Sequence, residues 1–130
     1  MGNNIEILNR TLDSLWLRNK VINHNIANVN TPNYKRLTVN FEDKLKEAMA
    51  NRIKLNITNE KHITRDRDLS QMKPSITVDR SRSYRFDGNN VNIDVESAEL
   101  AKNSIMYNAV VNQITSEFDR LKNAISEGSK

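Results

Sequence analysis

The 130-residue chain contains no cysteine, two prolines and three glycines, and only 5% of its residues are aromatic. Without cysteine it cannot form a disulfide framework, a thiolate nucleophile or a cysteine-ligated metal site. The glycines are scattered at Gly2, Gly88 and Gly128, so the chain has no glycine-rich loop of the phosphate-binding kind. No run of about 18 apolar residues occurs, and the sequence therefore predicts no membrane span.

The residue types that carry catalysis are present but are not arranged for it. His24 and His62 lie in different segments, with no second ligand at metal spacing. No serine lies in a nucleophile elbow, and most acidic residues fall in the first turns of expected helices, where the helix dipole favours them. The sequence predicts no enzyme, no cofactor and no metal. The N-terminus also lacks the basic and apolar regions of a cleaved secretory signal, so export would need another route.

Apolar residues recur three and four apart near each end of the chain, which places them on one stripe of a helix, as a coiled-coil seam requires. The N-terminal seam consists of Ile5, Leu8, Leu12, Leu15, Ile22 and Ile26. The C-terminal seam consists of Leu100, Tyr107, Val111, Ile114, Phe118, Leu121 and Ile125. Asn19 and Ser104 fill polar gaps, and Asn19 either fixes the register or borders a hydrated gap. Because a stripe cannot bury itself, the seams predict helix pairing and assembly.

Periodicity and turn residues divide the chain into four segments. Residues 1–36 are predicted to form an N-terminal helix with its turn, and residues 37–50 a short helix. Residues 51–90 are predicted to form a polar and loosely structured middle, and residues 91–130 a C-terminal helix. The first helix is expected from about Asn4 to about Asn28, and the last from an N-cap at Asp94 to a stop at Gly128. The predicted fold class is mainly α, with the long terminal helices pairing as a coiled coil around an irregular middle with short β segments.

The middle segment carries only weak strand signals. Apolar residues alternate in the manner of a strand at residues 53–57 and 76–78. A turn at residues 87–90 predicts a hairpin between residues 84–86 and 91–93. The long polar stretch between the strand signals is typical of a functional or irregular segment.

The first helix is expected to stop before Pro32, which lacks a backbone N–H and pushes Thr31 out of helical conformation. Pro32 and Asn33 then suit the second and third positions of a turn. In a type II turn the third position requires positive φ, which glycine tolerates best and asparagine next. The sequence therefore predicts positive φ at Asn33. A short helix over residues 41–49 is expected to follow.

Charge is distributed unevenly along the chain. Residues 51–86 carry nine basic and four acidic side chains, whereas residues 87–130 carry four and seven. A basic middle could indicate nucleic-acid binding. Against this, residues 65–68 alternate in sign, and only Tyr84 and Phe86 are nearby for base stacking. A solvated or partner-facing surface is the better interpretation, and no nucleic acid is predicted.

The residues after the first seam form a motif that ends in a tight turn. Its members are Asn25, Ile26, Ala27, Asn28, Thr31, Pro32, Asn33, Tyr34 and Lys35. This motif resembles the N-I-A-N and T-P-G-Y-K signature of bacterial flagellar rod and hook proteins, with Asn33 in place of the usual glycine. Residues 87–100, DGNNVNIDVESAEL, resemble the family's second signature. Within the family, the short length and the FEDKL segment at residues 41–45 are most similar to a proximal-rod member.

The resemblance implies a structural subunit of the flagellar basal-body rod, exported by the flagellar type III apparatus and assembled outside the inner membrane, in the periplasmic and cell-wall space. It implies an oligomer that contacts rod subunits of the FlgC type and further rod proteins, the adaptor FliE, the ring protein FliF and export-gate proteins. The nearest alternative is a sister rod protein of the FlgC type. A cytoplasmic coiled-coil adaptor is the alternative from another class, and it would stay inside the cell.

Overall fold

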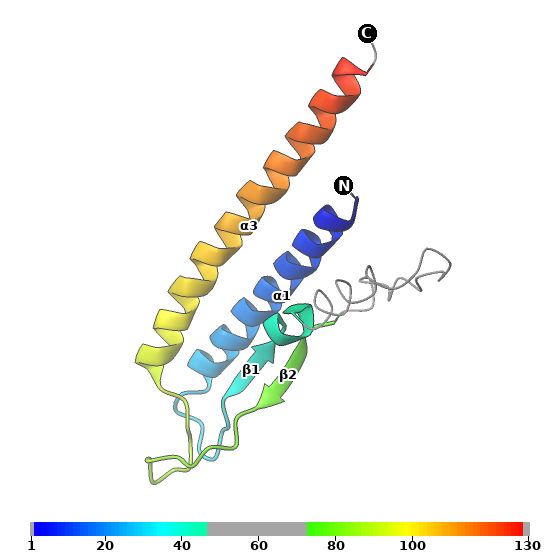
Figure 1. Ribbon diagram of the computed structural model, residues 1–130. Coiled ribbons are helices and arrows are strands. Elements are labelled where there is room, and N and C mark those ends of the chain that lie inside the picture. Colours follow the sequence, from blue (N-terminus) through cyan, green and yellow to red (C-terminus); the bar gives the residue numbers. More distant parts are fainter. Residues whose placement is uncertain (1, 47–72, 129–130) are drawn as a thin grey trace, which may run out of the picture.

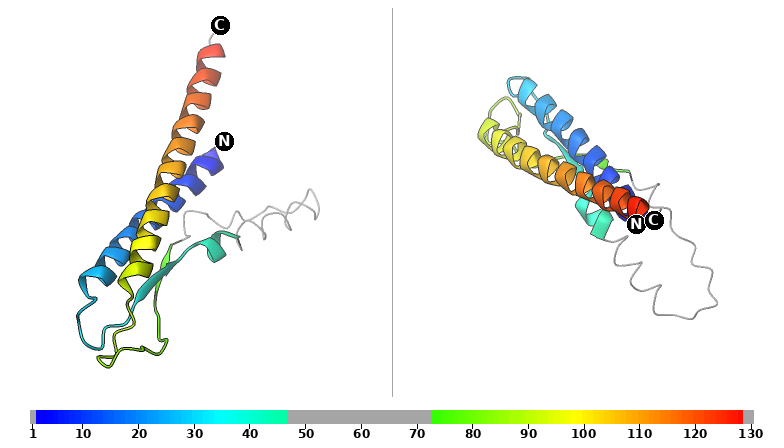
Figure 2. Two further views of the ribbon diagram at one scale, coloured as in Figure 1. Left: turned by 90° about the vertical axis from the view of Figure 1, so that its left-hand side faces the viewer. Right: turned by 90° about the horizontal axis from the view of Figure 1, so that it is seen from above.

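The computed structural model describes residues 2–46 and 73–128 (Figure 1). Its elements in chain order are α1 (Gly2–Ala27), β1 (Leu37–Asn40), β2 (Ser75–Val78) and α3 (Ile93–Glu127), and residues 42–46 are also helical. The two long helices lie side by side and antiparallel, so both chain termini are at the same end of the molecule (Figures 1 and 2). The predicted mainly α fold with paired terminal helices is confirmed.

Helix α1 lies between α3 and the sheet, and two adjacent stripes of its surface are buried for that reason. Leu15 and Ile22 belong to the first stripe and are 2% and 4% exposed. Ser14 and Val21, one position earlier in each case, belong to the second and are also buried. Since neighbouring residues on a helix point about 100° apart, one stripe cannot serve both neighbours.

The two helices differ in length, because α3 has 35 residues and α1 has 26. Their register is fixed by Asn103, whose Nδ2 donates to the carbonyl oxygen of Leu15 at 2.9 Å. At this antiparallel register the first residue of α1, Gly2, lies opposite about residue 116 of α3, at 1.5 Å per residue along each axis. The C-terminal part of α3 therefore extends past α1, as Figure 1 shows. Among the described residues, no helix combines the length and the apolar character needed to cross a bilayer.

Strands β1 and β2 form an antiparallel pair in which Val39 faces Ile76 and Leu37 faces Val78. Val39 is buried, whereas Ile76 and Val78 are about half exposed. On its helix-facing edge, β1 is held by Arg18, which donates to the Val39 carbonyl oxygen at 3.2 Å. Strand β2 is the one that alternation at residues 76–78 predicts, whereas residues 53–57 and the end of the helix predicted over 41–49 lie outside the described residues.

Two local predictions about the start of α3 are wrong. Residues 84–86 and 91–93 form no hairpin, because β2 pairs with β1 instead and Ile93 already belongs to α3. The N-cap is Asn92 and not Asp94, since the Asn92 side chain accepts hydrogen bonds from the backbone N–H groups of Asp94 and Val95. Asn92 can do this because its backbone is extended, with φ −112° and ψ 119°. At the other end, Gly128 is the C-cap, as predicted.

The burial of the first stripe makes a prediction about stability. Leu15→Ala should lower the free energy of unfolding by about 2–5 kcal/mol, because it removes a side chain that is only 2% exposed and leaves a cavity. The matched control is Ile105→Ala on α3, where the side chain is 71% exposed and the loss should stay within about 0.5 kcal/mol. Urea unfolding followed by circular dichroism measures both variants, and equal losses would contradict the assigned packing.

Candidate assembly site

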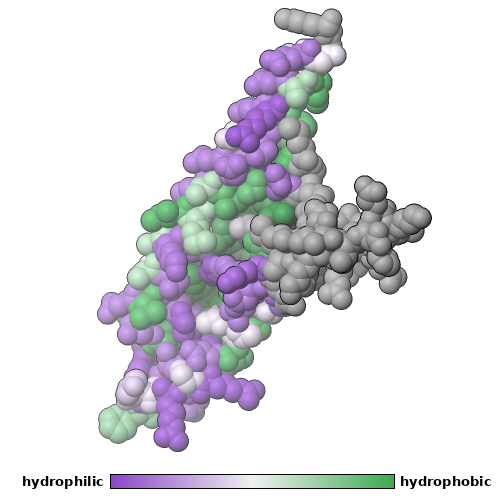
Figure 3. All heavy atoms as spheres, viewed as in Figure 1, coloured by the Kyte–Doolittle hydropathy of each residue, from purple (hydrophilic) through white to green (hydrophobic). Residues whose placement is uncertain are grey.

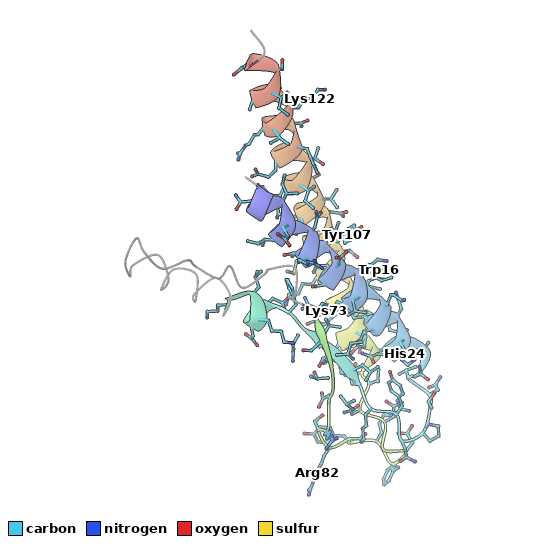
Figure 4. All side chains as sticks on the ribbon, turned by 90° about the vertical axis from the view of Figure 1, so that its right-hand side faces the viewer. Trp16, His24, Lys73, Arg82, Tyr107 and Lys122 are labelled. Atoms are coloured by element: carbon cyan, nitrogen blue, oxygen red, sulfur yellow. The ribbon has the colours of Figure 1, made fainter. Side chains whose placement is uncertain are left out.

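Residues 25–36, which contain the first motif, meet residues 87–96 of the second motif at the end of the molecule away from the chain termini (Figures 1 and 4). We call this contact the signature junction. Its side chains are mostly amides, with one ion pair between them. They are Asn25, Asn28, Asn33, Tyr34, Lys35, Arg36, Asn89, Asn90 and Glu96.

Asn25 is fully buried at the centre of the signature junction. Its Nδ2 donates to the Leu37 carbonyl oxygen at 2.8 Å and to Glu96 Oε2 at 3.0 Å. Its Oδ1 accepts from the Leu37 backbone N–H at 2.9 Å and from the Tyr34 hydroxyl at 3.0 Å. These four bonds use the full capacity of the amide, so Asn25 ties α1, β1 and α3 together.

Glu96 is also fully buried, and it forms an ion pair with the Arg36 Nε in addition to its bond from Asn25. A buried carboxylate is tolerated when a cation and further donors satisfy it. The helix dipole alone, which the sequence suggested for this acid, is therefore an incomplete account. The nearby Tyr34 hydroxyl reflects this environment, because burial and then the charge of Glu96 raise the pKa of Tyr34.

Asn89 joins the second motif to the end of α1, and it too is fully buried. Its Nδ2 lies 2.9 Å, 3.0 Å and 2.9 Å from the carbonyl oxygens of Asn28, Val29 and Thr31. Its Oδ1 accepts from the Val91 backbone N–H at 2.8 Å. These three carbonyls belong to the turn that follows α1, so Asn89 holds this turn from a distant part of the chain.

Backbone contacts between the two motifs depend on a left-handed residue in each. Asn33 has a φ of 60°, which confirms the predicted turn geometry, and Gly88 has a φ of 73°. The Asn33 N–H donates to the Asp87 carbonyl oxygen at 2.7 Å. A Cβ on Gly88 would lie 2.8 Å from Asn33 Oδ1, so only glycine fits there without a shift. Lys35 Nζ adds a 2.7 Å bond to the Gly88 carbonyl oxygen.

The remaining residues of the first motif are less enclosed than Asn25. Those that are half-buried are Ile26, Asn28, Tyr34 and Lys35. Those that are exposed are Ala27, Thr31, Pro32 and Asn33. The motif thus fixes the junction through Asn25 and leaves its turn on the surface.

Burial along the N-terminal seam follows the packing of α1. Leu15 and Ile22 are buried. The half-buried members are Ile5, Leu8, Leu12 and Ile26. Asn19 is half-buried, and its Oδ1 accepts from Asn23 of the same helix at 2.8 Å.

The C-terminal seam separates into two stripes on α3. The half-buried members are Leu100, Tyr107, Ile114 and Leu121. Val111, Phe118 and Ile125 are 37%, 50% and 68% exposed. Asn103 rather than Ser104 takes the buried polar position against α1. These three exposed side chains, which we call the outer stripe, are spaced seven residues apart and lie on one flank of the helix.

Figure 3 agrees with this division: hydrophobic residues gather where α1 and α3 meet, and a smaller hydrophobic patch lies near the C-terminal end of α3. No group of His, Asp or Glu side chains in the described residues could hold a metal ion.

Sequence reasoning missed several junction residues. Asn89, Asn90 and Glu96 belong to the second motif, but turn and helix-dipole rules already gave them ordinary roles. The resemblance of residues 87–100 to a family signature was the one signal that grouped them. Asn103 carried no signal, because its neighbour Ser104 fitted the heptad spacing.

No family model matches the chain. It is similar to the flagellar basal body rod protein FlgB of Bacillus subtilis, with 36% identity over 124 residues that cover 95% of this chain and 94% of the relative. The FlgB protein of Borreliella burgdorferi is 39% identical over 114 residues, or 83% of this chain and 84% of the relative. The FlgB protein of Proteus mirabilis is 30% identical over 131 residues, or 89% and 90% of the two chains.

The buried amide predicts a large effect of a small change. Asn25→Asp removes both donated bonds and places a second carboxylate against Glu96. The free energy of unfolding should therefore fall by about 3 kcal/mol. Asn9→Asp makes the same chemical change at an exposed position of α1 and should be nearly neutral. Thermal unfolding at neutral pH compares the two, and similar midpoints would argue against the junction as described.

The turn makes a separate prediction. Asn33→Gly should leave the free energy of unfolding unchanged, because glycine accepts positive φ. Asn33→Val should lower it by about 1–2 kcal/mol, because a β-branched side chain clashes at positive φ. Chemical unfolding of both variants measures the difference. If the valine variant is as stable as the glycine variant, the left-handed geometry is not required.

Proposed function

The chain belongs to the FlgB family of flagellar basal body rod proteins, and from that premise we propose that it builds the proximal rod by packing its terminal helices against those of neighbouring subunits. Membership of the family makes it a structural protein of the flagellar basal body and not an enzyme. It also agrees with the resemblance to rod proteins that the sequence carries.

The outer stripe supports assembly through the helices. Val111, Phe118 and Ile125 remain exposed although α1 covers the adjacent stripe, and the last two lie in the part of α3 that extends past α1. Apolar side chains at seven-residue spacing are suited to pairing with another helix. A neighbouring subunit's helix is the occupant that an oligomeric rod provides.

We further propose that the flagellar type III apparatus exports the chain and that it assembles in the periplasmic and cell-wall space. Membership of a flagellar basal body rod family supports this route, because the subunit has to reach the rod. The proposed neighbours are FlgC-type and further rod subunits, the adaptor FliE, the ring protein FliF and the export gate. Deleting the gene should abolish basal bodies, and a plasmid copy should restore them; basal bodies in the deletion strain would contradict the function.

The outer stripe can be tested in the same strain. Phe118→Asp places a charge on a side chain that is exposed in the isolated chain and buried in the proposed rod, where an unpaired charge costs several kcal/mol. We expect normal synthesis and helix content but loss of the subunit from basal bodies and loss of motility.

Ser116→Asp is the matched control, because it adds the same charge at an exposed position two residues away on another face of α3. This variant should assemble. If the Phe118→Asp strain is as motile as the control strain, the outer stripe is not an assembly surface.

A further inference from the structure

The segment between β2 and α3 projects from the end of the molecule opposite the chain termini, with Arg82 pointing away from the rest of the structure (Figures 1 and 4). We call residues 80–86, with the sequence RSRSYRF, the tip loop. Tyr84 and Phe86 are 106% and 112% exposed, so neither ring packs against the molecule that carries it. Arg80 and Arg82 are exposed as well.

The backbone of the tip loop is nevertheless held in place at both ends. At its start, Asn90 Nδ2 donates to the Asp79 carbonyl oxygen at 3.0 Å. In its second half, the Ser83 hydroxyl donates to the Asn89 carbonyl oxygen, and the Arg85 Nη1 donates to the Val29 carbonyl oxygen at 2.9 Å. An anchored loop therefore displays the aromatic rings. This lowers the entropic cost of binding, because the loop is already ordered before a partner binds.

The three arginines of the tip loop have different roles. Arg85 is committed to the structure, with an ion pair to Asp87 at 2.7 Å besides its bond to the carbonyl oxygen of Val29, just after α1. Arg80 and Arg82 form no ion pair with any residue that the structure describes. Two uncommitted guanidinium groups thus flank two exposed rings, and arginine and aromatic residues are the types enriched at the centres of protein interfaces.

We propose that the tip loop is a docking site that inserts Tyr84 and Phe86 into a carboxylate-lined pocket on a different protein of the basal body. This inference rests on the proposed function. Burial of the two rings would remove about 150–250 Å² each from water. Arg80 and Arg82 would pair with carboxylates at the rim, where the guanidinium fork makes two parallel hydrogen bonds.

A protein pocket fits the tip loop better than an anionic bilayer. Lipid-binding basic segments carry clusters of about four to eight lysines and arginines, whereas this loop offers two free cations between Asp79 and Asp87. A second copy of the chain fits poorly as well. Its exposed apolar stripe has Asp119 beside Phe118, but Arg120 and Lys122 follow at once and cancel that charge.

A photo-crosslinking residue tests the partner directly, in cells that assemble flagella. With Phe86→p-benzoylphenylalanine we expect adducts in purified basal bodies to a protein other than this chain, at a peptide in which acidic residues outnumber basic ones. Ile105→p-benzoylphenylalanine, on the exposed surface of α3, should not label that peptide. Adducts only to copies of this chain, or none at position 86 in assembled basal bodies, would overturn the proposal.

Charge reversal supplies an independent test. Arg80→Glu with Arg82→Glu should reduce incorporation into basal bodies at least tenfold without changing helix content. Lys44→Glu with Lys46→Glu, at exposed positions outside the tip loop, changes the net charge equally and should assemble normally. Equal incorporation of both double variants would refute the docking role, while absence of the wild-type chain from basal bodies would refute the proposed function itself.

Vesicles of phosphatidylglycerol and phosphatidylcholine separate the bilayer from the protein pocket. The purified chain should sediment with them no more than the variant Tyr84→Ser with Phe86→Ser. Binding that the wild type shows and this variant loses would assign the tip loop to a lipid surface and overturn the proposal.

Discussion

A buried carboxylate on α3, which two other parts of the chain satisfy together, holds this structure in place. Glu96 lies in the first turn of α3, Arg36 precedes β1, and Asn25 lies in α1. Because a charge without partners is costly away from water, loss of Arg36 or Asn25 leaves the buried Glu96 carboxylate with one of its two partners missing. The helix pair, the turn and the first strand consequently depend on one another, although few apolar side chains are fully enclosed between them.

Sequence reasoning succeeded where local chemistry decides the outcome. Helical periodicity located both long helices, and the preference of asparagine for positive φ gave the conformation of Asn33. It failed where a residue with an ordinary local role has a distant partner. Asn89 follows a turn glycine, and its position indicates only a turn, yet its amide satisfies carbonyls of the turn that follows α1. The wrong hairpin has a different origin, because residues 84–86 form a bend and turn in place of a strand and Ile93 already belongs to α3.

The long helix α3 serves two kinds of contact with adjacent stripes. One stripe faces α1 and includes Asn103, whose single directional bond to Leu15 sets the register of the pair. The outer stripe remains available, and the length of α3 beyond α1 gives it room to meet a neighbour. A seven-residue repeat read from sequence cannot separate these stripes, because Ile114 and Phe118 are four residues apart and satisfy the same pattern.

The two ends of the molecule therefore differ in physical character. At the signature junction, amides and an ion pair fix the backbone through directional bonds, and arginines are displayed from that fixed frame. At the free end of α3, exposure of Phe118 and Ile125 offers contacts that are apolar and non-directional. Directional bonds suit recognition of one partner, whereas apolar stripes accept small shifts between neighbouring helices. This polarity would serve both proposed contacts, docking through the tip loop at one end and helix packing through the outer stripe at the other.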